Sequence, residues 1–311
     1  MTTDSSLSGS LPQVRAAQPS GAGRRDKPRP WGQIASQVFL ISASVLWLLP
    51  ILFALYIALR PYSETTKYGY VSLPHSLTLK NFTDAWSSSG MPHFFWNSVL
   101  ITVPAVVIVL GLASGVAFVL TRVNLKVNVA LLILFTAGNL LPQQVIITPL
   151  YRLYLLIPLP SFLSDSGLMY NSITGLVVIN VSFQLGFCVF VLSNYMKSIP
   201  EEMYEAALVD GAGLWTRFWR LTVPLCRPAL AALATLLTTW IYNDFFWAIT
   251  LMSSGDKRPV TSALANLQGQ FVSNQNLIAA AAMIAAVPTL VVYILLQKQF
   301  IAGLSLGSSK G

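Results

Sequence analysis

The stretch SIPEEMYEAALVDGAGLWTRFWRLTVPLCRP, residues 198–228, is the one long polar interruption between strongly apolar segments in the C-terminal part of the chain. Ser198 followed three residues later by Glu201 is the pattern of a capping box, which predicts a helix start. Gly211 and Gly213 make continuation of that helix unfavourable. The stretch is therefore expected to form two short helices joined by a bend.

The first of these helices carries a small, flat surface. Ala206, Ala207 and Gly211 have little or no side chain, and they lie beside acidic residues. Such a surface suits close approach by another protein rather than chemistry, because it offers neither a nucleophile nor a set of metal ligands. An ordinary amphipathic hairpin at the cytoplasmic face of a membrane is the alternative interpretation.

Composition places the whole chain in a membrane. Hydrophobic residues make up 54% of the 311 residues and charged residues only 10%, and the mean hydropathy is +0.63. These values indicate an all-α polytopic membrane protein. The net charge of +8 does not indicate a nucleic-acid partner, because the basic residues are scattered among loops and form no stripe with stacking aromatic residues.

Six apolar segments are long enough to cross a hydrocarbon layer about 30 Å thick, which takes roughly 20 helical residues. They lie near residues 34–59, 95–120, 127–149, 172–195, 229–252 and 277–300. The third is interrupted by polar residues and prolines, namely Asn139, Pro142, Gln143, Gln144 and Pro149. It is either a kinked helix whose polar groups bind neighbouring helices or a helix that lines a transport path.

The distribution of basic residues predicts the topology. Of the 19 Lys and Arg residues, 13 lie in the N-terminal tail, in loops 121–126 and 196–228, and at the C-terminal end. Because cytoplasmic loops carry the excess of positive charge, both termini and residues 198–228 are expected on the cytoplasmic side of the cell membrane. The chain is then expected to divide into a disordered tail (1–33), a transmembrane domain (34–303) and a short cytoplasmic tail (304–311).

A second group of candidate residues lies within the fifth predicted span, in TTWIYNDFFWAIT. Asp244 is an acid at membrane depth, which is costly and usually faces water, a partner or a substrate. Beside it, Trp240 and Tyr242 supply aromatic faces and Asn243 an amide. Aromatic faces and amides suit the C–H faces and hydroxyls of sugar rings. We expect this group to line a substrate path.

Asn180 and Gln184 in the fourth predicted span are spaced i, i+4 and share one helix face. They either face the same path or form hydrogen bonds between helices, each worth about 1 kcal/mol.

The spacing of residues in the polar stretch has a family likeness. Glu205-Ala206-Ala207, then Gly211 after three residues, then an aliphatic residue and Pro224, resembles the EAA loop of ABC importer permeases, with Val223 where leucine is usual. Three further stretches resemble MalG-like permeases of carbohydrate ABC importers: LTLKNFTDAW followed by FFWNSVLIT, WIYNDFFWA, and the C-terminal GLSLGSSKG. The resemblance covers the chain from about residue 34 to its end.

The resemblance implies partners and residue roles. The chain would pair with a second, homologous permease, an extracytoplasmic solute-binding protein would deliver the sugar, and residues 198–228 would act as a coupling helix in a cleft of an ATPase dimer. Glu205 would make the charged contact, Ala206 and Ala207 would pack in the cleft, and Gly211 would allow the bend. The remaining members of the expected coupling set are Glu201, Asp210 and Pro224.

The chain carries no G-x-x-x-x-G-K-[ST] phosphate-binding loop. We therefore expect a transport subunit without enzymatic activity, surrounded by membrane lipid and binding no cofactor, with ATP and Mg on the partner ATPase. Two other classes remain open: an ion-coupled secondary carrier, which would work without an ATPase, and a scaffold protein that transports nothing. Within ABC importers, another small solute is the alternative to a sugar.

Overall fold

The computed structural model describes residues 30–88, 90–123, 126–138, 142–264 and 274–305, so most of the two expected tails lies outside the described residues. The described residues are helical, apart from loops and one isolated bridge between Pro158 and Leu168. Contacts divide the chain into two units, Met1–Ile51 and Leu52–Gly311. The described part is all-helical, as the sequence predicts.

The first unit contains most of helix α1 (Pro30–Ala58). Most of its side chains are apolar, and those that lie within this unit are almost all exposed; Trp31 and Trp47, for example, are 80% and 81% exposed. A helix with so much apolar surface is stable where lipid or another protein surrounds it. The expected first span over residues 34–59 is therefore confirmed as a long apolar helix.

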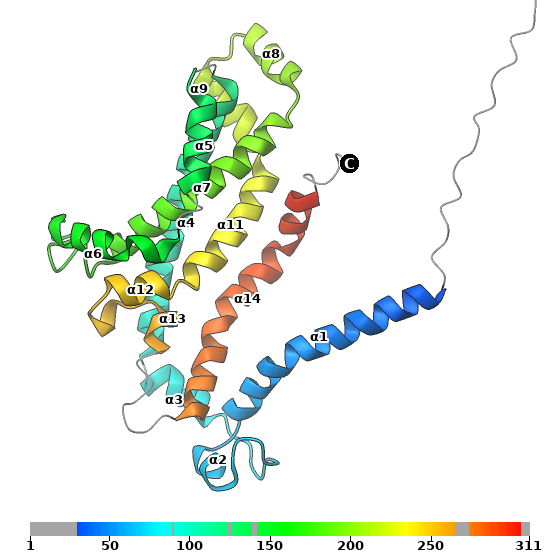
Figure 1. Ribbon diagram of the computed structural model, residues 1–311, viewed down its shortest axis with the longest axis vertical. Helices are drawn as coiled ribbons and strands as arrows, with labels where there is room; N and C mark the ends of the chain where they lie inside the picture. Colours follow the sequence, from blue (N-terminus) through cyan, green and yellow to red (C-terminus); the bar gives the residue numbers. More distant parts are fainter. Residues whose placement is uncertain (1–29, 89, 124–125, 139–141, 265–273, 306–311) are drawn as a thin grey trace, which may run out of the picture. The chain divides into compact units, whose positions relative to one another are not determined.

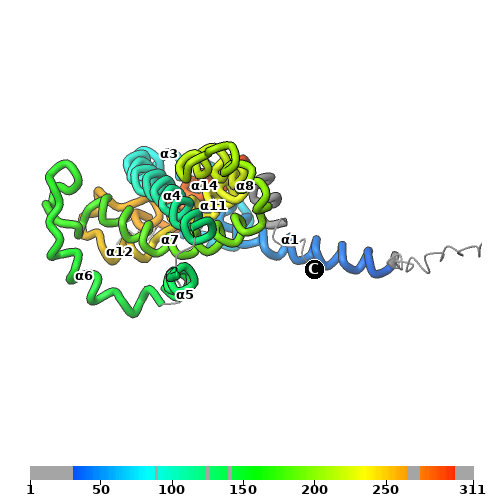
Figure 2. Tube along the Cα trace, turned by 90° about the horizontal axis from the view of Figure 1, so that it is seen from above, coloured from blue at the N-terminus to red at the C-terminus, as the bar shows by residue number. Residues whose placement is uncertain are grey.

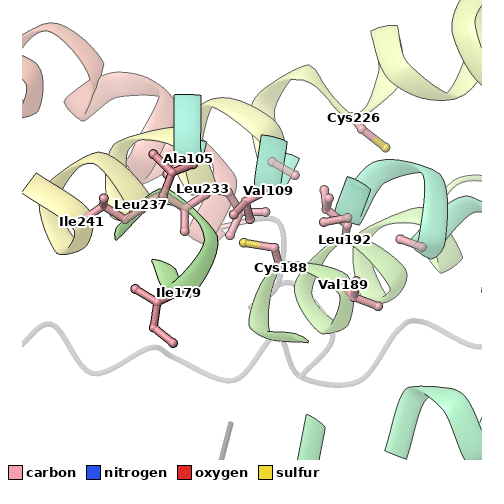
Figure 3. Packing of buried hydrophobic residues seen from close by; sticks show 14 of the residues in the cluster. Ala105, Val109, Ile179, Cys188, Val189, Leu192, Cys226, Leu233, Leu237 and Ile241 are labelled. Atoms are coloured by element: carbon pink, nitrogen blue, oxygen red, sulfur yellow. The ribbon is translucent and has the colours of Figure 1, made fainter. Parts of the chain in front are cut away.

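The second unit is built around four long helices that lie side by side in Figure 1: α4 (Met91–Arg122), α7 (Ile173–Lys197), α11 (Arg227–Tyr242) and α14 (Gln275–Ser305). Its core lies between α4, α7 and α11, whose buried side chains meet in Figure 3. Small residues on α4, such as Ala105 and Ala113, are fully buried and allow close approach of the neighbouring helices.

Helix α14 packs against α11 and against the short helix α3 (Lys80–Ser88). Ala280 and Ala281 form its contact surface and are fully buried. Ser172 caps the start of α7, because its Oγ accepts a 2.9 Å hydrogen bond from the backbone N–H of Gly175.

Among the described residues, four helices are long and apolar enough to cross a membrane, and the number rises to six if each of two bent helix pairs forms one span. The predicted spans at 34–59, 95–120, 172–195 and 277–300 correspond to the four single helices. The bent pair Asn128–Gly138 and Gln143–Leu156 covers the span predicted at 127–149. In the other pair, Leu214–Leu225 and Arg227–Tyr242, only the second helix overlaps the span predicted at 229–252.

The region of the third predicted span consists of separate helices: α5 (Asn128–Gly138), the 3₁₀ turn η1 (Gln143–Ile146) and α6 (Ile147–Leu156). Pro142 has extended backbone angles, and prolines stop the preceding helix because they lack a donor and clash with the preceding turn. Figure 2 shows α6 to one side of the four long helices.

The fifth predicted span is shorter than expected. Helix α11 ends at Tyr242, and a new short helix, α12 (Phe246–Leu251), follows. At its other end, α11 makes an angle of 70° with the preceding helical segment Leu214–Leu225. That segment comprises α9 (Leu214–Thr216), the π-helix η2 (Arg217–Thr222) and α10 (Val223–Leu225).

Short elements connect the long helices. Helices α2 (Tyr62–Tyr68) and α3 lie between α1 and α4, at the end opposite α8 (Glu201–Val209) in Figure 1. The 3₁₀ turn η3 (Gly255–Lys257) and α13 (Val260–Ala263) lie between α12 and α14 in the chain.

Candidate coupling surface and substrate path

Helices α8 and α9 are the expected pair of short helices, and a bend joins them. Gly211 has φ +77°, a value that side chains other than glycine rarely adopt. Its N–H donates to the carbonyl of Leu208 at 3.0 Å, and the N–H of Ala212 donates to that of Ala207 at 2.9 Å. This pair of bonds is a Schellman motif, which satisfies the last carbonyls of a helix. Gly211 therefore fixes the bend.

The expected capping box is wrong. Helix α8 begins after Pro200, with no side-chain capping bond. The hydroxyl of Ser198 instead donates to the carbonyl of Tyr195 at 2.7 Å, at the end of α7. The reason is that α7 reaches Lys197, so Ser198 ends that helix, and Pro200 alone supplies the preset backbone angle at the start of α8.

The expected coupling residues lie mostly on an open surface. Glu201, Glu205, Ala206, Asp210 and Gly211 are exposed, whereas Ala207 and Pro224 are half-buried. Large apolar side chains around them are also uncovered, with Val209 88% and Trp215 73% exposed. We call the exposed face of residues 201–220 the coupling surface. It combines acidic, small and large apolar groups at the end of the long helices (Figure 1).

A buried arginine lies beneath the coupling surface. Arg122, the last residue of α4, has a side chain only 6% exposed. Its Nη1 lies 2.9 Å from Oε2 of Glu201, and its Nη2 donates to the carbonyls of Met196 and Ile199. Its guanidinium also lies 3.7 Å from the ring centroid of Tyr204. We call these five residues the open clasp, because Glu201 is 72% exposed.

Tyr204 links the open clasp to the π-helix. Its side chain is 4% exposed, and its hydroxyl is hydrogen-bonded to Oγ1 of Thr222 at 3.0 Å. Thr222 in turn donates to the carbonyl of Arg217 at 3.1 Å. A π-helix leaves its backbone carbonyls in an unusual register, and the Thr222 hydroxyl satisfies one of them.

The expected path residues at Asp244 and Asn180 are in contact. Nδ2 of Asn180 donates to Oδ2 of Asp244 at 3.1 Å and to the carbonyl of Leu176 at 2.9 Å. Oδ1 of Asp244 accepts from the backbone N–H of Trp247 at 3.1 Å, in the first turn of α12. Asp244 thus binds a backbone N–H in the first turn of α12 and connects that helix to α7.

The other expected path residues are distributed over several surfaces. The ring of Trp240 lies 5.3 Å from that of Phe187, and Trp240 is 44% exposed. The hydroxyl of Tyr242 donates to the carbonyl of Ala285 in α14 at 3.1 Å, and the exposed Asn243 donates to that of Thr239 at 2.8 Å. Gln184 is half-buried in α7. That these residues contact a substrate stays a prediction.

A second buried arginine lies after α1. The side chain of Arg60 is fully buried and forms an ion pair of 2.8 Å with Glu64, whose side chain is 7% exposed. Arg60 also donates to Ser72 at 2.8 Å, and Glu64 accepts from the backbone N–H groups of His75 and Ser76 at 3.0 Å each. We call these five residues the sealed clasp.

The hydrogen bonds of the sealed clasp change the acidity of Glu64. The backbone N–H of His75 is the largest cause, and with Arg60 and Ser76 it lowers the pKa of Glu64 to about 2. Burial acts in the opposite direction, because it disfavours the charged form. Glu64 is therefore ionised at any ordinary pH.

Neither clasp was predicted from the sequence. The i, i+4 spacing of Arg60 and Glu64 was a local signal, since such pairs face each other on a helix. Arg122 offered no such signal, because in the sequence it is a lone basic residue near the end of a predicted span. Its partners lie more than 70 residues further along the chain, and no local pattern reveals them.

Residues 107–305 match the family described as "Binding-protein-dependent transport system inner membrane component". The melibiose/raffinose/stachyose import permease protein MelC of Bacillus subtilis is 32% identical over 76% of this chain and 83% of its own length. The diacetylchitobiose uptake system permease protein NgcG of Streptomyces coelicolor is 30% identical over 88% and 87%. The alpha-glucoside transport system permease protein AglG of Rhizobium meliloti is 33% identical over 76% and 62%.

The fold is also that of a solved transporter. The structure of a bacterial ABC transporter involved in import of the acidic polysaccharide alginate matches 87% of this chain and 96% of its own, with a TM-score of 0.72 and 20% identity. Another structure shows an alginate ABC transporter in complex with a periplasmic protein that holds an alginate pentasaccharide.

Proposed function

Because the chain belongs to the family of binding-protein-dependent transport system inner membrane components and is a permease subunit of an ABC importer, we propose that it imports a saccharide and couples to a partner ATPase through the coupling surface. It is a multi-pass inner membrane protein. Both termini and the coupling surface are placed on the cytoplasmic side by this proposal, in keeping with the excess of Lys and Arg there.

A saccharide is the substrate class that the relatives support. MelC, NgcG and AglG are each described as handling sugars or glycosides, although they differ in which one. The exposed ring of Trp240 and the amide of Asn243, which lie where α11 ends, are groups that bind sugar C–H faces and hydroxyls. Asn180, Gln184, Tyr242 and Asp244 complete the proposed path.

One observation carries the coupling proposal: the glycine-fixed bend that leaves acidic, small and apolar side chains uncovered together. Large exposed apolar patches with polar neighbours mark protein interfaces. The proposed roles are a charged contact by Glu205, packing by Ala206 and Ala207, and orientation of the surface by Glu201, Asp210, Gly211 and Pro224. The ATPase dimer would supply ATP and Mg, and a homologous permease and an extracytoplasmic binding protein would complete the complex.

The proposed mechanism is a change between two states of the assembled complex. Closure of the ATPases moves residues 198–228 as a rigid body, which swings α7 and α11 and exchanges inward for outward opening. The ATPase can drive this change only if it contacts the coupling surface differently in the two states.

Two variants of the coupling surface test the proposal. Gly211→Pro cannot adopt φ +77° and loses the N–H that bonds Leu208, so the bend must change. Glu205→Gln removes the charge alone. In complexes reconstituted with their partners, we expect both to hydrolyse ATP while uptake per ATP falls by about 10-fold or more.

Gly213→Ala is the matched control. Gly213 has a negative φ of −66° and no atom within 4 Å of an added Cβ, so alanine fits there. This control should transport normally. Normal uptake by Gly211→Pro would refute the coupling role.

The substrate is tested separately, by competition. A panel of unlabelled mono-, di- and trisaccharides, amino acids and inorganic phosphate is added to cells that express the complete importer and take up a labelled sugar mixture. Competition by one group of saccharides supports the proposal. Uptake blocked only by amino acids or phosphate would leave the permease role intact and refute the sugar. Uptake without any ATPase subunit would favour an ion-coupled carrier.

A further inference from the structure

The open clasp joins three parts of the chain that are far apart in sequence. Arg122 ends α4, Met196 and Ile199 lie at the junction between α7 and α8, and Glu201 and Tyr204 belong to α8. All of them contact one guanidinium group. A single side chain therefore connects α4 to the base of the coupling surface.

The chemistry of the contacts explains why an arginine is present. The last carbonyls of a helix have no partner within it and carry partial negative charge, so a cation there is favourable. The planar guanidinium presents five donors in a fixed fork and also stacks on aromatic rings. It can satisfy Met196, Ile199 and Glu201 while its face lies on Tyr204; a lysine cannot do all of this at once.

The contacts fix Tyr204 from both sides. The guanidinium covers its ring at 3.7 Å, and its hydroxyl is bonded to Thr222 in η2. A second contact between α4 and η2 is apolar: the rings of Phe118 and Phe218 lie 5.2 Å apart. The contacts run from α4 through α8 to η2 without interruption.

We infer that Arg122 is a positioning residue for energy coupling, which fixes α8 to α4 so that α4 moves together with the coupling surface. This inference rests on the proposed function, and it adds α4 to the parts that the ATPase drives. A coupling surface joined only to its sequence neighbours would move α7 and α11. With Arg122 in place, α4 follows α8 directly, in addition to its packing against α7 in the core.

The test measures the distance between α4 and α8 in the complete complex with its ATPase. Spin labels are attached to Val119→Cys on α4 and Glu202→Cys on α8, two exposed positions outside the clasp, with buried Cys188 and Cys226 replaced by alanine. Distances are recorded without nucleotide and with ATP and vanadate. In the parent, we expect the distance to change by less than about 2 Å, the size of a small helix shift.

Arg122→Gln should release α8 from α4. We expect its distance distribution to broaden and to shift by about 5 Å between the two states, about one helical turn. Arg122→Lys should give an intermediate result, since it retains the charge but not the fork. Lys126→Gln removes a charge from the exposed residue nearby and should match the parent.

The outcomes separate the two proposals. If the distance changes by a full turn in the parent, or stays fixed in Arg122→Gln, the inference is wrong. If Arg122→Gln does not assemble, Arg122→Lys decides, and a distance identical to that of the parent overturns the inference. A parallel cross-link from Ala206→Cys to the ATPase tests the proposed function. When that cross-link forms, a failed distance test refutes the clasp alone.

Discussion

The sealed clasp and the open clasp have the same design but different exposure. In each, an arginine near the end of a long helix pairs with a glutamate and satisfies backbone carbonyls. In the sealed clasp both charged side chains are buried, whereas in the open clasp Glu201 is 72% exposed. A buried pair loses much when one partner is removed, and an exposed one loses little. We therefore expect the sealed clasp to hold the fold and the open clasp to serve coupling.

The largest expected effect comes from breaking the sealed clasp. Arg60→Leu leaves Glu64 buried without its ion pair and removes the donors to Gly69, Tyr70 and Ser72. We expect the yield of folded protein in mild detergent to fall by about 10-fold or more. The measurement is the monodisperse fraction in size-exclusion chromatography.

Two variants complete this test. Lys80→Gln removes an exposed charge from α3 and should leave the yield unchanged. Arg122→Leu should lower the yield by no more than about 3-fold, since its partner Glu201 is exposed. Equal losses at Arg60 and Arg122 would contradict the division of roles between the clasps.

A smaller loss of folding stability is expected as pH falls. Glu64 has a pKa of about 2 in the folded protein and 4.5 as its ordinary value, so the unfolded chain binds its proton first as pH falls. Its contribution to stability is fully present above pH 4.5 and is lost as pH falls towards 2. The melting temperature of the purified protein should decline over this interval.

Glu64→Gln identifies the source of this decline. The variant should be less stable than the parent at pH 7, and the difference should shrink as pH falls from 4.5 to 2. A difference that stays constant over that interval would show that Glu64 is not the titrating group.

The smallest expected effect belongs to the hydroxyl of Tyr204. Tyr204→Phe keeps the ring beneath Arg122 and removes only the bond to Thr222, whose own hydroxyl still donates to Arg217. We expect a loss of about 1 kcal/mol in the free energy of unfolding. Denaturant titration of the detergent-solubilised protein measures it. Tyr204→Leu, which also removes the ring, should lose more; an equal loss would mean that the ring stack contributes nothing.

Much of the fold could be predicted from hydropathy, because each long helix is apolar over most of its length. The interruption of the third segment was signalled by Pro142, whereas the break in the fifth segment, after Tyr242, could not be placed. At Asn243 and Asp244, both side chains bond nearby backbone groups, and such side chains compete with the helix for its own donors and acceptors. The hydropathy of a segment does not reveal that competition.

The bend at Gly211 was predictable because a glycine can take a positive φ at little cost. The failure of the predicted capping box could not be foreseen, because the sequence does not show that Ser198 also lies within reach of the end of α7. The contact between Asn180 and Asp244 joins residues 64 positions apart, the first in α7 and the second between α11 and α12. Tertiary contacts of this kind have no local signal in one sequence.

The most direct test of the central claim measures the labelling and cross-linking of a cysteine that replaces one alanine on the coupling surface. Ala206→Cys is made in a background without Cys188 and Cys226, and it is expressed with its ATPase, second permease and binding protein. We predict that a membrane-impermeant maleimide labels it only after the cells are opened, and that a short cross-linker joins it to the ATPase. Labelling in intact cells, or labelling from the inside with no cross-link to any ATPase, would contradict the account.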